Sequence, residues 1–187
     1  MNQQPSTSFV QVLEMINSHL KQFFQDYYRM RVKKKSTSSS ILGKRINKYL
    51  YDNFESNTEA YQDAVNTCIL LACKYDVIGV VLQMIKFGAN INYQNYNAYS
   101  PIHLACFSGN HRVLEVLIEN GANPFLIDNE GFTPKELIPY RKKMLVDKHG
   151  AKANLSGFKI CEQIIEEAEK NYFEKIKNHH QETILEK

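Results

Sequence analysis

A self-similarity with a fixed spacing of 33 residues constrains this sequence more than any other feature. Leu71-Ala72-Cys73 recurs as Leu104-Ala105-Cys106, and Gly88-Ala89-Asn90 recurs as Gly121-Ala122-Asn123. So many agreements in one register are not expected by chance. A fixed period of this length is typical of proteins built from stacked structural repeats.

Within one period, local signals predict a helix, a turn and a second helix. Ser100 can cap the first helix through its hydroxyl, and Pro101 suits a first turn, where no backbone N–H is needed. A second helix is expected over 111–120, because its apolar residues fall on one face. Gly121 ends that helix, since glycine accepts the left-handed conformation that follows a helix. The apolar stripe of the second helix consists of Val113, Leu114, Leu117 and Ile118.

This unit resembles the ankyrin repeat, whose period is about 33 residues and whose first helix opens with T-P-L-H-x-A. The matching stretch is Ser100-Pro101-Ile102-His103-Leu104-Ala105. An earlier repeat, from about Thr67 to Tyr93, lacks the proline and the histidine. A later one contains Thr133-Pro134 and departs from the pattern after Leu137. The resemblance covers about residues 67–137, with a degenerate repeat to about 177.

On both flanks of the repeats we expect helices that cover the ends. Pro139 and the basic run Arg141-Lys142-Lys143 are expected to interrupt the third repeat, before a helix resumes near Phe158. Residues 41–66 are expected to cap the other end. The apolar positions of the C-terminal helix are Phe158, Cys161, Ile164, Ile165, Ala168 and Tyr172.

The resemblance implies an all-α fold, an ankyrin-type helical repeat array of two to four helix-turn-helix units with an N-terminal helical arm and a C-terminal capping helix. We expect residues 1–40 to form an amphipathic helix and a basic, Ser-rich linker. Residues 41–177 are expected to form the ankyrin-repeat domain with its flanking capping helices. Residues 178–187 are expected to be a polar tail.

The N-terminal segment carries a helical stripe whose function the sequence leaves open. Its members follow 4-3 spacing and are Phe9, Leu13, Ile16, Leu20, Phe23, Tyr27 and Met30. Such a helix can dock on its own chain, pair as a coiled coil, or lie in a groove of a partner. A membrane-surface helix is disfavoured, because Glu14 and Asp26 interrupt the polar face.

The charge of the chain is unevenly distributed. Residues 1–48 contain nine Lys/Arg and two Asp/Glu, a net charge of +7, so the remainder carries −4 of the total of +3. The basic segment within residues 1–48, which we call the basic arm, is expected to meet an anionic partner, either nucleic acid or an acidic protein surface. A solvated stretch and a nuclear-import signal are the alternatives. The residues concerned are Arg29, Arg31, Lys33, Lys34, Lys35, Lys44, Arg45 and Lys48.

Motifs that carry chemistry are missing from the sequence. The cysteines show no CxxC spacing, and no phosphate loop, H-E-x-x-H motif or calcium loop occurs. His103 occupies the repeat's histidine position, where the resemblance implies a structural hydrogen bond to a neighbouring loop. We therefore expect no catalytic residue, no metal and no cofactor, and the chain is not expected to be an enzyme.

The cellular compartment follows from what the sequence lacks. The N-terminus has no basic region followed by an apolar core, and no apolar run approaches the roughly 20 residues of a spanning helix. We expect no transmembrane segment and an intracellular protein, in the cytoplasm, with the nucleus or an organelle as alternatives.

The resemblance also implies where partners bind, since ankyrin arrays meet them with loop tips and first helices. The alternative is that some of the residues predicted to bind partners pack against the N-terminal arm. We expect a non-catalytic adaptor or structural subunit that docks other proteins in a larger complex; the alternative is a nucleic-acid or ribonucleoprotein-associated subunit that uses the basic arm. The predicted protein-binding residues are Lys74, Tyr75, Phe87, Tyr96, Asn97, Tyr99, Phe107, Ser108, Asn129, Glu130 and Phe132.

Overall fold

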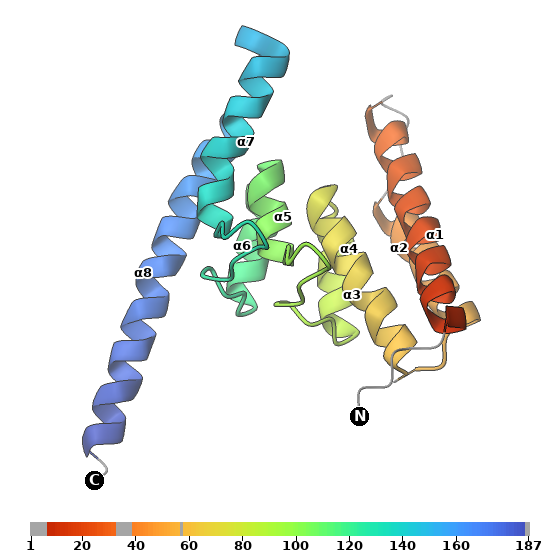
Figure 1. Ribbon diagram of the computed structural model, residues 1–187, viewed down its shortest axis with the longest axis horizontal. Helices are drawn as coiled ribbons and strands as arrows, with labels where there is room; N and C mark the ends of the chain where they lie inside the picture. Colours follow the sequence, from red (N-terminus) through yellow and green to blue (C-terminus); the bar gives the residue numbers. More distant parts are fainter. Residues whose placement is uncertain (1–6, 33–38, 57, 186–187) are drawn as a thin grey trace. The chain divides into compact units, whose positions relative to one another are not determined.

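The computed structural model describes residues 7–32, 39–56 and 58–185, which form α-helices, one short 3-10 helix and loops without any strand. Two compact units divide the chain, residues 1–93 and residues 94–187. Figure 1 shows the helices of each unit running beside one another. The all-α helical repeat fold expected from the sequence is confirmed.

The first unit contains two helix pairs. Its helices are α1 (Thr7–Val32), α2 (Ser39–Asn53), α3 (Glu59–Lys74) and α4 (Ile78–Lys86). α1 and α2 form one pair, and α3 and α4 form the other. The first helices of the two pairs, α1 and α3, pack on each other, and so do the second helices, α2 and α4. The buried face of α2 consists of Leu42, Ile46 and Leu50, so α2 covers the apolar side of α4.

The N-terminal helix α1 packs on its own chain. Leu20, Phe24 and Tyr27 are buried on its inner side, and α1 contacts both α2 and α3. The sequence left open whether this helix docks on its own chain, pairs as a coiled coil or lies in a groove of a partner. The structure shows the first arrangement. Phe24 was not part of the expected stripe, and the expected Phe23 is only half-buried. The side chains at positions 9, 13 and 16 lie outside the described residues.

The first repeat begins earlier than the sequence suggested. Its first helix, α3, starts at Glu59 rather than near Thr67, because the hydroxyl of Thr58 accepts the N–H of Tyr61 at 3.2 Å and caps the helix there. No proline stands near position 67 to impose a later start. The predicted boundary was wrong by about eight residues.

The second unit also contains two helix pairs. Its helices are α5 (Pro101–Ser108), α6 (His111–Glu119), α7 (Pro134–His149) and α8 (Ser156–Leu185), with the 3-10 turn Gly150–Lys152 between the last two. α5 and α6 form one pair, and α7 and α8 form the other. The first helices, α5 and α7, pack on each other, and so do the second helices, α6 and α8. The buried residues of this unit include Ile102, Ala105, Cys106, Val113, Leu114, Leu117, Leu137, Ile138, Phe158, Cys161, Ile165 and Ala168.

The central repeat follows the local signals of its sequence. Pro101 is the first residue of α5, and Gly109 ends that helix in the left-handed region, with φ 70°. The second helix, α6, spans residues 111–119 and is followed by Gly121 at φ 86°. The predicted helix, turn and helix are therefore confirmed to within one residue.

The prediction that Pro139 and the basic run interrupt the third repeat is wrong. α7 is continuous from residue 134 to residue 149 and contains Pro139 as its sixth residue. A proline there removes one helical hydrogen bond, to the carbonyl of Lys135, and costs about 3 kcal/mol. Burial of Leu137 and Ile138 on one side of the proline offsets this cost, and so does the bond of 3.0 Å from Lys142 to Glu162 of α8 on the other.

The C-terminal helix α8 closes the second unit as expected. A side chain at Gly157 would place its Cβ 2.2 Å from the carbonyl oxygen of Gly109, so the start of α8 lies directly against the end of α5. Phe158, the residue that follows, is buried beside this contact. Beyond residue 170 the described side chains of α8 are exposed, and the helix continues into the segment expected to be a polar tail.

Candidate protein-binding surface

Two loops in the second unit share one hydrogen-bonding scheme, 33 residues apart. In the first loop the Oδ1 of Asn95 accepts the N–H groups of Asn97 and Tyr99, both at 3.0 Å. In the second loop the Oδ1 of Asp128 accepts two N–H groups at 2.9 Å, those of the residues two and four positions later. One side-chain oxygen therefore sets the turn of each loop.

The tips of these two loops are joined to each other. The backbone N–H of Asn129 donates to the carbonyl of Asn97 at 3.2 Å, and its side-chain amide donates to the carbonyl of Tyr96 at 2.9 Å. The amide of Gln94 donates to the carbonyl of Ile127 at 2.8 Å. These bonds use backbone groups and the amides of Gln94 and Asn129, so the ring of Tyr96 takes no part in joining the tips.

His103 ties the second loop to α5. Its Nδ1 accepts the backbone N–H of Ser100 at 3.2 Å, so the ring proton lies on Nε2, which donates to the carbonyl of Phe132 at 3.2 Å. The ring is fully buried. Burial lowers the pKa of His103 below its usual value, against the opposing effects of the Phe132 carbonyl and the Asp128 carboxylate. The structural hydrogen bond that the resemblance implied for this histidine is confirmed.

The candidate residues of the second unit lie on these loops and at the C-terminal end of α5. Tyr96 is 87% exposed, whereas Tyr99 and Phe107 are half-buried. Burial and the carboxylates of Asp128 and Glu130 raise the pKa of the Tyr99 hydroxyl, so acidic groups lie close to this ring. The remaining candidates of this unit are the exposed Asn97, Asn129 and Glu130 and the half-buried Ser108 and Phe132.

In the first unit the three candidate residues have different environments. The ring of Tyr75 stacks on Phe24 of α1 with centroids 6.0 Å apart, so it packs against the N-terminal helix, as the alternative interpretation proposed. Lys74 is exposed and lies over the Tyr75 ring. Phe87 is 37% exposed and lines a hollow of about 490 Å³ beside Tyr61.

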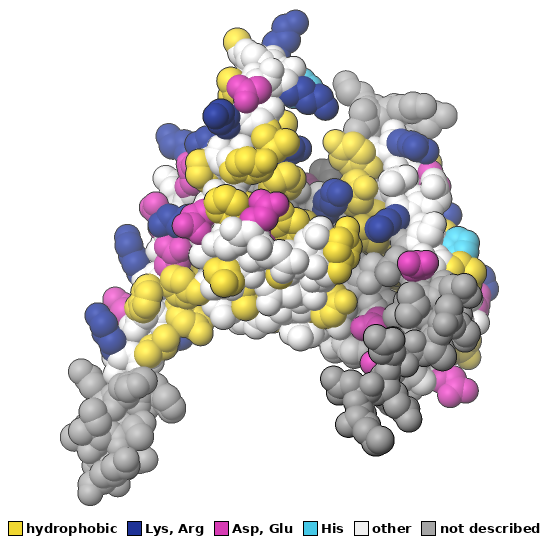
Figure 2. Space-filling view, in the orientation of Figure 1, with side chains coloured by type: hydrophobic (Ala, Val, Ile, Leu, Met, Phe, Trp, Pro, Cys, Tyr) yellow, Lys and Arg dark blue, Asp and Glu magenta, His cyan; other side chains and the backbone are white. Residues whose placement is uncertain are grey.

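The continuous α7 adds residues to this surface that the sequence analysis missed. Tyr140 is 51% exposed and stacks on Phe132, with ring centroids 6.3 Å apart. The guanidinium of Arg141 lies 4.6 Å from the ring centroid of Phe107. In the space-filling view, hydrophobic side chains are exposed over α7 and the adjoining end of α5 (Figure 2).

The signal for these missed residues was present in the sequence. Adding 33 to Phe107 gives Tyr140, and adding 33 to Ser108 gives Arg141. Pro139 hid this match, because a proline at that place usually ends a helix. We define the aromatic strip as Tyr96, Tyr99, Phe107, Phe132 and Tyr140.

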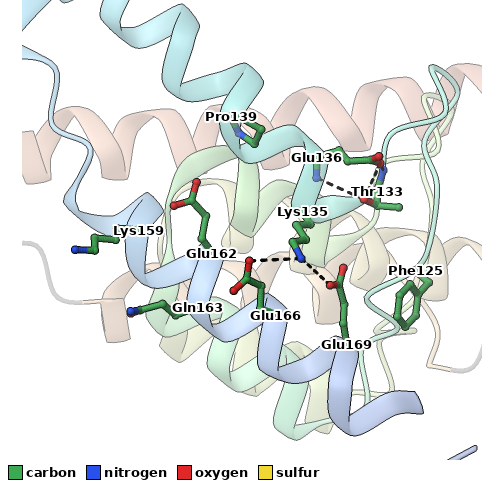
Figure 3. Close-up of a pocket in the computed structure, with 10 residues that line it drawn as sticks. All are labelled: Phe125, Thr133, Lys135, Glu136, Pro139, Lys159, Glu162, Gln163, Glu166 and Glu169. Carbon is green, nitrogen blue, oxygen red and sulfur yellow. Dashed lines mark hydrogen bonds and ion pairs between the residues drawn. The ribbon is translucent and has the colours of Figure 1, made fainter. Parts of the chain in front are cut away.

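A second hollow, of about 750 Å³, lies between α7 and α8 (Figure 3). Glutamates on both helices line it, and Lys135 points between two of them, 3.5 Å from Glu166 and 3.0 Å from Glu169. These ion pairs raise the pKa of Lys135, with the hydrogen bond to Glu169 as the largest cause. Lys135 therefore offsets part of the negative charge of this hollow, which four glutamates and two lysines line.

Among the described residues, reactive or metal-binding side chains do not cluster at the aromatic strip or at the hollow between α7 and α8. All four cysteines are free and buried, and burial raises the pKa of the Cys161 thiol to about 12, which keeps it protonated. Burial also raises the pKa of the other three thiols, Cys68, Cys73 and Cys106. Within the part of the chain that the structure describes, no three His, Cys, Asp or Glu side chains are placed to hold a metal ion.

The predicted anionic-partner arm is only partly described. Arg29 lies 3.6 Å from Asp26, and Lys48 lies 2.9 Å from Asp52, so both are paired along their own helices. Arg45 lies over the ring of Phe23, and Lys44 is exposed. Lys33, Lys34, Lys35 and the side chain of Arg31 lie outside the described residues.

Among the helices that the structure describes, none combines the length and hydropathy needed to cross a lipid bilayer.

Comparison with known proteins identifies the repeated segment. A family model described as ankyrin repeats in three copies matches residues 41–134. A segment of 71 residues, 37% of this chain, is 32% identical to an ADP-ribosylation factor GTPase-activating protein of Arabidopsis thaliana and covers 9% of it. An inactive serine/threonine-protein kinase of Bos taurus is 32% identical over 79 residues, which are 40% of this chain and 5% of the kinase.

A subunit of target of rapamycin complex 2 from Saccharomyces cerevisiae is 35% identical over 72 residues, 37% of this chain and 16% of that protein. The chain thus matches between 5% and 16% of the length of these three relatives. The similarity to them lies in a repeat segment and does not extend to the remainder of the larger proteins.

The buried, neutral His103 predicts a pH dependence of stability. Because its pKa is lowered on folding, the unfolded chain binds a proton at a pH where the folded chain does not. The free energy of unfolding should therefore fall as the pH drops from 7 to 5, by at most about 1.4 kcal/mol per pH unit from this group. Urea unfolding of the wild type and of His103→Gln at several pH values measures the difference. Equal pH slopes for the two proteins would contradict the role assigned to His103.

Proposed function

Because the chain belongs to the ankyrin-repeat family, whose repeats are protein–protein interaction modules, we propose that it is an adaptor or structural subunit that docks proteins in a larger assembly. The observation that supports this most is the aromatic strip on the loops and first helices of the second unit. Aromatic rings bury large areas at low entropic cost and dominate interface energetics. In the proposal the strip is the surface that the partner covers.

The rigidity of this surface supports the proposal as well. Asn95 and Asp128 fix the two turns, and His103 holds the second loop against α5. A surface that is already ordered before binding loses little conformational entropy when a partner arrives. The strip is therefore suited to recognition without rearrangement of its backbone.

The proposed compartment is the cytoplasm or another reducing compartment of the cell. The four cysteines are free and buried, which fits an environment where disulfides do not form.

Replacing exposed rings of the strip tests the proposal. Tyr96→Ala combined with Tyr140→Ala should lower the recovery of co-purifying partners about tenfold, because two rings of the interface are removed. Tyr99 and Phe107 are left intact, since their half-buried rings also pack within the unit. Quantitative mass spectrometry of proteins captured by the tagged full chain measures the effect.

The matched control is Tyr51→Ala, on α2. Tyr51 is 87% exposed, as is Tyr96, and lies outside the strip. The control should retain the partners, and both variants should keep the thermal unfolding midpoint of the wild type. Partner recovery that survives the double substitution would show that the strip is not the docking surface.

The second candidate function, a nucleic-acid or ribonucleoprotein-associated subunit, rests on the sequence charge of the arm. The net charge of +7 over residues 1–48 supports it, while the pairing of Arg29 and Lys48 with neighbouring aspartates weakens it. A protein that binds phosphates loses affinity steeply as salt rises, because its binding to nucleic acid releases counterions.

Filter binding of the full chain to a single-stranded RNA at several salt concentrations tests this candidate. Replacing Lys33, Lys34 and Lys35 by Gln should reduce the slope of log affinity against log salt by about 0.7 for each phosphate that is no longer neutralised. The control is the equal charge change Lys159, Lys175 and Lys177 to Gln, all exposed on α8. This candidate function is excluded if the wild-type protein binds no RNA, or if its affinity for RNA does not change with salt concentration.

A further inference from the structure

Arg141 is a cation without an anionic partner among the described residues. Its side chain is half-buried, its guanidinium lies over the ring of Phe107, and its Nε is buried with no hydrogen-bond acceptor. No carboxylate within the described residues forms an ion pair with it. A buried N–H without an acceptor is costly, because it has given up its hydrogen bond to water and has no replacement.

Two other cations of the same helix, Lys135 and Lys142, have anionic partners. Lys135 is held by Glu166 and Glu169 of α8, as Figure 3 shows. Lys142 is held by Glu162 of α8 at 3.0 Å. The cations that meet α8 are therefore matched, whereas Arg141, which contacts Phe107 of α5, is left for a group from outside.

The surroundings of Arg141 favour a carboxylate that arrives with apolar neighbours. Tyr140 and Met144 are 51% and 42% exposed, and Phe107 lies under the guanidinium. Covering these side chains would exclude water and strengthen an ion pair at Arg141. The planar guanidinium fork matches a carboxylate in a bidentate manner, which an ammonium group cannot do.

The charge of the second unit disfavours a polyanion at this place. Residues 94–187 contain 12 Lys/Arg and 13 Asp/Glu, and the loop that carries Phe132 also carries Asp128 and Glu130 near Tyr99. These carboxylates would repel a chain of phosphates that extends over the loop, whereas a single acidic side chain placed at Arg141 need not approach them.

We infer that Arg141 receives an Asp or Glu side chain of the partner protein, set in a short segment whose neighbouring apolar side chain packs on Tyr140 and Met144. This inference rests on the proposed function, since it names the chemistry of the partner that the aromatic strip docks. Phe107 positions the guanidinium, and the partner's carboxylate forms the ion pair that no described residue of the chain forms with it.

A phage-displayed random peptide library, selected on the immobilised full chain, tests the inference without knowledge of the natural partner. Peptides that depend on the strip should share an acidic residue beside an apolar one. Arg141→Gln should weaken their binding about tenfold or more, as expected for the removal of a hydrogen-bonded charge pair. The control Lys143→Gln makes the same charge change on an exposed side chain of the same helix and should leave binding unaltered.

The outcomes separate the inference from the proposed function. Peptides that fail to bind Tyr96→Ala/Tyr140→Ala but share no acid and tolerate Arg141→Gln would overturn the inference and leave the docking surface standing. A selection that yields no peptide dependent on the strip would overturn both. Binding of a single-stranded oligonucleotide that needs Arg141, without any acidic peptide doing so, would also overturn the inference. Circular dichroism melts of Arg141→Gln and Lys143→Gln should show that both variants fold and unfold cooperatively, since neither substitution removes an internal ion pair of the described residues.

Discussion

Each helix pair in this protein carries apolar side chains that it cannot bury by itself, so another pair has to cover them. In the second unit Val113, Leu114 and Leu117 of α6 are fully buried, and α6 packs on α8, in which Cys161 and Ile165 are also buried. The requirement fixes which faces turn inward, so first helices pack on first helices and second helices on second helices. What remains outside is the set of loops and helix ends on which the proposed function depends.

The loops between the helix pairs are ordered by their own hydrogen bonds and form an exposed surface. A single oxygen on Asn95, repeated on Asp128, satisfies two backbone N–H groups in each turn, and the tips bond to each other through Asn129. With the backbone satisfied internally, aromatic side chains are presented at fixed positions. Fold alone does not name a ligand, and in the proposed function the recognition chemistry comes from these side chains and from Arg141 beside them.

Much of the fold was predictable from sequence, because its local signals agree with its packing. Pro101 begins α5, Gly121 ends the following helix, and His103 holds the loop as the resemblance implied. Prediction failed where tertiary packing outweighs a local preference. Pro139 lies inside α7 because the burial of its neighbours and the ion pair of Lys142 offset the cost of one missing hydrogen bond.

The candidate surface was predictable in part for the same reason. The loop residues followed from the 33-residue spacing, whereas Tyr140 and Arg141 were missed with the helix that carries them. The packing of Tyr75 against α1 could not be predicted, since periodicity shows that an amphipathic helix has an apolar face but not what covers it. Phe24, outside the expected stripe, is the α1 residue that stacks on Tyr75.

Hydrogen–deuterium exchange of the full chain, alone and in complex with its co-purified partner, tests the central claim most directly. If the loops and first helices of the second unit form the docking surface, exchange should slow in residues 94–99 and 127–132 and in the part of α7 around Tyr140. It should stay unchanged in α6, residues 111–119, whose apolar side is already covered by α8. Slower exchange confined to α6 or to α8 would contradict the account.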